Sequence, residues 1–159
     1  MLELNVIRDN TWELNHNAIN RWMDNRQQLL IRFCGIIAVR PLSALSTRYA
    51  LDFQQFSELM VDYTSCGHFD IFERLMTQAR AQQNLDGIHA FLKQHYSVIS
   101  ASTECIVHFN DNFVDADNPR GLTRALSRLG DALEARFKAG DAMPELLHYS
   151  AKPLHLNQF

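Results

Sequence analysis

The sequence has no excess of basic charge and no long apolar run. Its 15 lysines and arginines stand against 18 acidic residues, so the net charge is −3 with the seven histidines neutral. A general attraction to nucleic-acid phosphates is therefore not expected. The longest apolar stretch, near residues 36–39, is far shorter than a membrane span, and the N-terminus lacks the basic start and apolar block of a signal peptide. These absences predict a cytoplasmic protein that binds neither nucleic acid nor membranes.

Cysteine, proline and glycine are also scarce, with three, four and six residues among 159. The odd number of cysteines and the lack of a C-x-x-C pair argue against a disulfide framework. We expect Cys34, Cys66 and Cys105 to pack as buried thiols. Hydrophobic residues make up 47% of the chain, which suits one compact domain over 1–159 with a frayed tail from about residue 151.

Apolar residues recur every three or four positions through most of the chain, which is the period of one helix face. The pattern predicts helices at about 17–39, 52–66, 70–79, 88–113 and 119–137, with a short final helix near Pro144. Pro41 and Gly67 are expected to end the first two helices. Because alternation with period two is almost absent, the predicted fold class is all-α, an antiparallel helical bundle with four main helices and shorter ones.

Several ionisable side chains fall on or beside the apolar helix faces. Arg26 lies between Trp22 and Leu29, where a guanidinium without carboxylates would be desolvated at a cost. We therefore expect a polar structural cluster inside or at one end of the bundle. Its predicted members are Arg26, Asp62, Glu73 and Glu134, with His68 beside them. The alternative is a capping box at the start of a helix, a solvated acid and an arginine that reaches water along its stem.

The sequence carries no catalytic signature. His68 could titrate near neutrality and act as a base, but the only nucleophile near it is Cys66, outside any recognised nucleophile motif. A di-metal bundle needs two inward Glu-x-x-His pairs, whereas the chain offers one such spacing, from Glu145 to His148. We expect no enzyme activity, no catalytic residues, no bound metal and no cofactor.

Two alternatives stay open from the residues alone. A histidine phosphotransfer or other signalling bundle needs little beyond an exposed histidine near a cation, and His89 with Lys93 one turn later is the best candidate. A metal-binding bundle enzyme built on Glu145 and His148 is the other. Otherwise, a small acidic bundle of this kind usually works by binding another protein.

Three segments of the chain resemble one protein family. Residues 60–75, MVDYTSCGHFDIFERL, are similar to the signature of the regulator of sigma D family, the Rsd and AlgQ anti-sigma factors. Residues 20–30, NRWMDNRQQLL, resemble the first helix of that family, and residues 129–137, LGDALEARF, resemble its late helix. Asp141 also fits the family. The resemblance weakens over 81–118 and after Asp141.

The resemblance implies an all-helical protein that binds the primary sigma factor of bacterial RNA polymerase. Its main target would be the C-terminal sigma domain that reads the −35 promoter element, so that sigma is kept from core polymerase and promoter and alternative sigma factors are favoured. Since aromatic groups are good interface anchors, we expect part of the strongest motif to face this partner. The predicted partner-binding residues are Tyr63, His68, Phe69 and Phe72.

Overall fold

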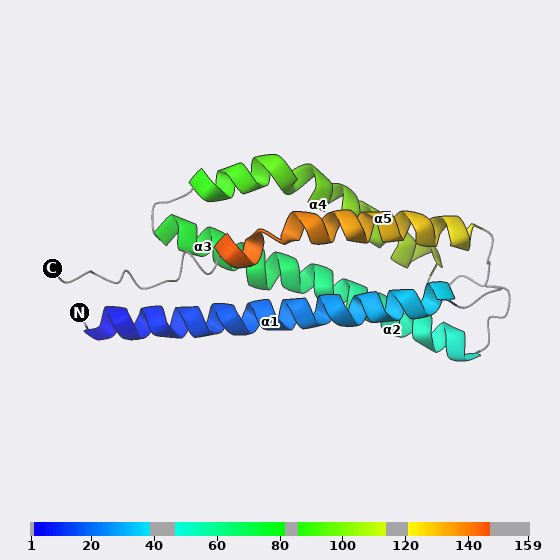
Figure 1. Cartoon of the computed structure of the whole chain (residues 1–159), viewed down its shortest axis with the longest axis horizontal. Helices are drawn as coiled ribbons and strands as arrows, with labels where there is room; N and C mark the ends of the chain where they lie inside the picture. Colours follow the sequence, from blue (N-terminus) through cyan, green and yellow to red (C-terminus); the bar gives the residue numbers. More distant parts are fainter. Residues whose placement is uncertain (1, 39–46, 82–85, 114–120, 147–159) are drawn as a thin grey trace.

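The computed structural model of the chain describes residues 2–38, 47–81, 86–113 and 121–146, and these segments are helical apart from a turn beside residue 141 (Figure 1). The elements are α1 (Leu2–Ala38), α2 (Thr47–Ser65), a π-helix η1 (Cys66–Phe72), α3 (Glu73–Ala81), α4 (Asp86–Phe113) and α5 (Leu122–Gly140). A final helical turn covers 143–146. The prediction of an all-α helical bundle is confirmed. None of the described helices is both long and apolar enough to span a membrane.

Two helix pairs build the bundle. α1 packs along α2, and α4 packs along α5, with the two helices of each pair running in opposite directions (Figure 1). The π-helix η1 continues directly from α2 and contacts α1 as well as α3. This arrangement places η1 beside the middle of α1.

Helix α1 is much longer than its apolar pattern predicts. It begins at Leu2 rather than near residue 17. The reason is that residues 2–34 contain no proline or glycine that would stop a helix, so the helix continues where the apolar period is weak. Residues 39–46, which include Pro41, lie outside the described residues.

The predicted helix end at Gly67 is wrong. Helix α2 passes through η1 into α3 without interruption, and Gly67 keeps a negative φ inside the π-helix. No helix starts at Asp70, so the alternative of a capping box with Glu73 is also wrong. Gly67 is instead needed for packing, because a Cβ at this position would lie 2.9 Å from Nε1 of Trp22.

At its start, α5 follows a glycine in the left-handed conformation, since Gly121 has φ 81°. The predicted start of this helix at about residue 119 lies outside the described residues, as does the tail from about residue 151 that was expected to fray. The expected short helix near Pro144 is present at 143–146.

The core contains two contrasting layers. The first, which we call the phenylalanine layer, lies toward the ends of α1 and α4 and the start of α2; it consists of Phe33, Phe53, Phe56, Phe109 and Phe113. The second, the aromatic–arginine layer, lies nearer the middle of α1 and consists of Trp22, Arg26, Tyr63, Arg136 and Phe137. Leu126, Leu129 and Leu133 of α5 are buried in the same core.

The three cysteines are free and differ in exposure. Cys66 is buried and Cys105 is half-buried, but Cys34 is exposed on α1. The expectation of three buried thiols is therefore wrong for Cys34. Burial raises the pKa of Cys66 to about 11, so its thiol stays protonated at neutral pH and is a poor nucleophile.

Candidate partner-binding surface and pocket

Trp22 of α1 is the centre of the aromatic–arginine layer. Its side chain is buried and stacks on Tyr63 of α2, with ring centroids 5.5 Å apart and an interplanar angle of 4°. Tyr63 in turn meets the ring of Phe137 of α5 edge to face at 5.3 Å. The three rings connect α1, α2 and α5, and such pairs contribute stability beyond the area they bury.

Two glycines contact the same tryptophan. A Cβ at Gly67 of η1 would lie 2.9 Å from Trp22 Nε1, and a Cβ at Gly140 would lie 2.9 Å from Trp22 Cη2. Real Cβ atoms are essentially never found so close to a neighbour. Both backbones therefore approach the indole at a distance that only glycine allows.

Arg26 lies at the solvent edge of the aromatic–arginine layer. Its guanidinium carbon is 4.6 Å from the centroid of the Phe137 ring, a cation–π geometry. Its Nη1 is 2.5 Å from Oδ1 of Asp141. The arginine side chain is 20% exposed and the aspartate side chain 57% exposed, so water reaches this pair on the acid side.

The polar cluster predicted around Arg26 is not assembled in the described residues. Asp62 and Glu73 are exposed, and Glu134 pairs with Lys138 at 2.9 Å on the surface of α5. The hydrogen bond to Lys138 lowers the pKa of Glu134. The carboxylate that Arg26 uses is Asp141, which the sequence marked only as a residue that fits the family.

Arg136 of α5 is a functional candidate that the sequence interpretation missed. The residue is 8% exposed. Its Nη1 donates hydrogen bonds to the Ile99 carbonyl at 3.2 Å, to Ser102 Oγ at 3.1 Å and to Thr103 Oγ1 at 2.8 Å. Burial lowers the pKa of the guanidinium. The available signal was its spacing, because Arg136 falls on the apolar face seven residues after Leu129.

The aromatic residues predicted to face a partner divide into two groups. Phe69 is 66% exposed and His68 is exposed, whereas Tyr63 is 1% exposed and lies in the core. The ring of His68 meets Phe69 edge to face at 4.8 Å and stacks near Phe72 at 6.2 Å. Phe72 is half-buried. The exposed face of η1 therefore presents His68 and Phe69, with the half-buried Phe72 against His68, while Tyr63 packs in the core against Trp22 and Phe137.

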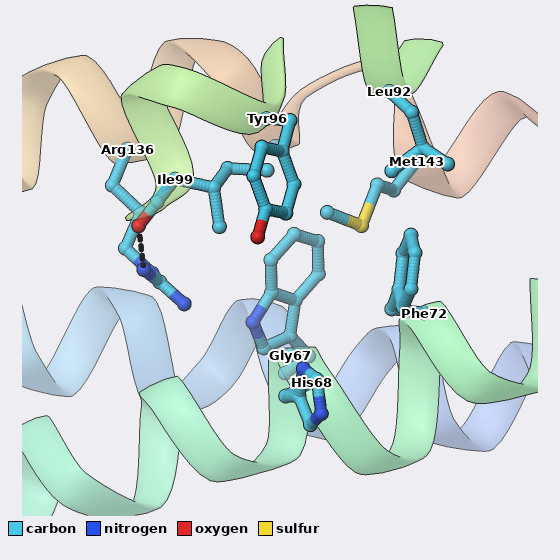
Figure 2. Close-up of a pocket in the computed structure, with 10 residues that line it drawn as sticks. Gly67, His68, Phe72, Leu92, Tyr96, Ile99, Arg136 and Met143 are labelled. Carbon is cyan, nitrogen blue, oxygen red and sulfur yellow. Dashed lines mark hydrogen bonds between the residues drawn. The ribbon is translucent and has the colours of Figure 1, made fainter. Parts of the chain in front are cut away.

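A cavity of about 100 Å³ opens beside this surface (Figure 2). Its lining comes from α1, η1, α4, α5 and the final turn, and consists of Trp22, Gly67, His68, Phe72, Leu92, Tyr96, Ile99, Arg136, Gly140 and Met143. Figure 2 shows Arg136 on one side of the pocket and Phe72 with Met143 on the other. The pocket therefore joins the π-helix to the aromatic–arginine layer.

Two buried polar atoms beside the pocket have no hydrogen-bond partner. They are Nε1 of Trp22 and the hydroxyl of Tyr63. Burial raises the pKa of Tyr63 to about 12. Buried donors without partners are uncommon in proteins, and a bound water molecule or an ion commonly satisfies them.

The described residues form neither of the two other candidate sites, the phosphotransfer site at His89 and the metal site at Glu145. His89 and Lys93 are both exposed on α4. Glu145 is exposed on the final turn, and His148 lies outside the described residues. Within the segments that the structure describes, no group of three or more His, Cys, Asp and Glu side chains is placed to hold a metal ion.

Comparison with known proteins gives the family. The family model described as "Regulator of RNA polymerase sigma(70) subunit, Rsd/AlgQ" matches residues 1–148. The chain belongs to the Rsd/AlgQ family. The match extends through α5 and the final turn, so every residue of the aromatic–arginine layer lies inside it. Comparison with solved structures found no significant match.

Members of the Rsd/AlgQ family named "Regulator of sigma D" are similar to this chain over most of their length. The protein of an Enterobacter species is 32% identical over 137 residues, which cover 80% of this chain and 78% of the relative. The protein of Yersinia enterocolitica is 29% identical over 144 residues, covering 86% and 82%. That of Yersinia pestis is 28% identical over 143 residues, covering 86% and 81%.

Proposed function

We propose that this protein is an anti-sigma factor that binds the primary sigma factor of bacterial RNA polymerase. The observation that carries the proposal is the family match over residues 1–148, whose description names regulation of the sigma(70) subunit. The name of the relatives, "Regulator of sigma D", supports it. Such a protein acts by binding, not by catalysis, and it acts in the cytoplasm, where RNA polymerase works.

The main target of the proposed binding is the C-terminal sigma domain that reads the −35 element. By holding this domain, the protein keeps sigma from core polymerase and from the promoter, and so favours alternative sigma factors. A domain that binds DNA through a helix-turn-helix carries a basic surface. The net charge of −3 of this chain is complementary to such a surface.

The proposed contact surface is the exposed face of η1. Phe69 is the largest exposed aromatic side chain of the motif, and exposed aromatic residues often dominate the binding energy of an interface. Asp62 and Glu73, which were expected inside the bundle, flank η1 in the sequence and are exposed. Their charges can meet basic side chains of sigma, as phosphates of DNA would.

Calorimetric titration with the purified C-terminal domain of the cognate primary sigma factor tests the proposal. We expect saturable one-to-one binding that weakens as the salt concentration rises. Phe69→Ala should weaken binding at least about tenfold, as truncation of an interface anchor does. The matched control is Val107→Ala, because Val107 is 51% exposed on α4, away from η1, and should leave binding unchanged.

Two results would contradict the proposal at different levels. If neither the sigma domain nor intact sigma binds at tens of micromolar, the chain does not act on sigma. If both bind but Phe69→Ala has no more effect than Val107→Ala, the function stands and the assigned surface is wrong.

A further inference from the structure

The pocket of Figure 2 contains an arginine and no acidic residue among its lining side chains. Most of the wall is apolar, with Phe72, Leu92, Ile99 and Met143 among the lining residues. Arg136 is the buried cation among the lining side chains. An apolar cavity with one buried cation favours a ligand that has an apolar body and one negative charge.

Arg136 lacks an anionic partner within the described residues. Its hydrogen bonds to these residues leave from Nη1 and end on neutral oxygens, so among the described residues none is formed by Nη2 or Nε. The nearby carboxylate of Asp141 is already paired with Arg26. A buried guanidinium is normally balanced by a carboxylate or phosphate, because desolvating it alone is costly. A bound anion would supply the missing partner in a two-pronged geometry.

The size of the cavity limits the ligand. Its volume is about 100 Å³, somewhat below that of an engineered apolar cavity of about 150 Å³ that binds benzene. Because the pocket opens to the surface beside the exposed side chains of His68 and Tyr96, a short branched chain fits and a single ring can enter with part of its body at the opening. A nucleotide or a long acyl chain is too large. With its charged group at Arg136, the apolar body of such a ligand would extend toward Phe72 and Met143 on the opposite side (Figure 2).

We propose that this pocket binds a small monocarboxylate with an apolar body, such as an aromatic or branched-chain carboxylic acid. The carboxylate accepts hydrogen bonds from Nη2 and Nε of Arg136, and the apolar body packs beside Trp22 and Met143. Tyr96, which is 66% exposed and lines the pocket, stands at its entrance. The argument for this ligand does not rest on the proposed action on sigma, although His68 and Phe72 belong both to the pocket lining and to the proposed contact surface.

The test is an NMR titration of the ¹⁵N-labelled full-length protein at neutral pH with sodium benzoate. The reporter is the indole N–H signal of Trp22, whose Nε1 has no partner in the protein. Trp12→Phe removes the only other tryptophan signal and so assigns it. Two matched probes accompany benzoate: benzyl alcohol has a similar size without charge, and inorganic phosphate has charge without an apolar body.

We expect benzoate to shift the Trp22 signal saturably, with benzyl alcohol binding at least about tenfold more weakly because it lacks the charge-assisted hydrogen bonds. Phosphate at equal concentration should not displace benzoate. Arg136→Met keeps a similar side-chain volume and removes the charge. It should weaken the binding of benzoate at least about tenfold and leave the binding of benzyl alcohol unchanged. Arg128→Met, a change of an exposed arginine on the same helix, is the control and should have no effect.

Arg136→Met also removes hydrogen bonds to α4 and so could disturb the fold. A second variant that keeps Arg136 therefore tests the pocket separately. Leu92→Trp fills the pocket from α4, leaves Arg136 intact and should abolish the benzoate shift. The proposal is overturned if millimolar benzoate leaves the Trp22 signal in place, if benzyl alcohol binds as tightly as benzoate, or if Leu92→Trp folds and still binds benzoate.

Discussion

The phenylalanine layer and the aromatic–arginine layer are both buried, yet they make very different demands on the sequence. In the first, apolar rings contact one another, as in the edge-to-face contact of Phe56 and Phe109 at 6.4 Å. In the second, a tryptophan stands against two glycine backbones and an arginine lies over a phenylalanine ring. The first layer needs apolar volume, which many residues can provide, whereas the second needs particular residues.

This difference coincides with the family resemblance. The segments 20–30, 60–75 and 129–137 contribute every residue of the aromatic–arginine layer, while no residue of the phenylalanine layer lies in them. The three segments are far apart in the sequence, and the fold brings them together around Trp22. The family motif therefore specifies a layer that supports the exposed face of η1 and one wall of the pocket.

The largest contrast should come from making the same substitution in both layers. Phe137→Leu should lower the free energy of unfolding by roughly 2–3 kcal/mol, and Phe56→Leu by roughly 1–1.5 kcal/mol. The extra loss reflects the Arg26 contact at 4.6 Å from the Phe137 ring. Urea denaturation of both variants measures the loss in free energy of unfolding. Equal losses would mean that a phenylalanine in the aromatic–arginine layer is no harder to replace than one in the phenylalanine layer.

Adding a methyl group to a glycine should have opposite effects in and outside the aromatic–arginine layer. Gly140→Ala forces a Cβ against Trp22 and should cost roughly 1–3 kcal/mol, as overpacking does. Gly35→Ala meets nothing within 4 Å and should stabilise the protein by roughly 0.5–1 kcal/mol, the difference in helix propensity. Thermal denaturation of the two variants is sufficient, and a stabilising Gly140→Ala would contradict the close packing around the indole.

Removal of Arg26 should cost less than a fully buried ion pair would. Because the guanidinium is partly exposed, Arg26→Ala should lower stability by about 1–2 kcal/mol, mostly through the ring contact. Asp141→Asn should cost about 0.5 kcal/mol or less, since the acid is exposed and screened. Chemical denaturation at low and high salt separates the two contributions. If Asp141→Asn lowers the free energy of unfolding as much as Arg26→Ala does, the ion pair, and not the contact with the Phe137 ring, accounts for the stabilisation by Arg26.

The smallest effect at neutral pH should come from Tyr63→Phe, which removes a buried hydroxyl without a partner. Its stability should stay within about 0.5 kcal/mol of the parent or rise. At high pH the unfolded chain loses its tyrosine proton near pH 10, while the folded protein keeps it until about pH 12. Stability should therefore fall as the pH rises through this range. Denaturation at several pH values from 9 to 12 gives the free energy of unfolding as a function of pH. This free energy should fall less steeply with pH for Tyr63→Phe than for the parent protein. Equal slopes for the two proteins would contradict the effect of burial on the tyrosine.

The sequence predicted the helices of the fold because their apolar period is strong in α2, α4 and α5. It did not predict the π-helix, since seven residues are too few to show a period different from that of an α-helix, and it took Gly67 for a stop. For the proposed site, the motif includes η1, but the sequence could not separate the exposed Phe69 from the buried Tyr63. The partner of Arg26 was missed because Asp141 is 115 residues away, and only the fold brings them together.

We propose that sigma binds at the exposed face of η1. Hydrogen–deuterium exchange of the protein, free and saturated with the C-terminal sigma domain, tests it most directly. If sigma binds there, residues 66–72 should exchange more slowly in the complex, and exchange around Val107 on α4 should not change. Slower exchange elsewhere, with residues 66–72 unchanged, would contradict it.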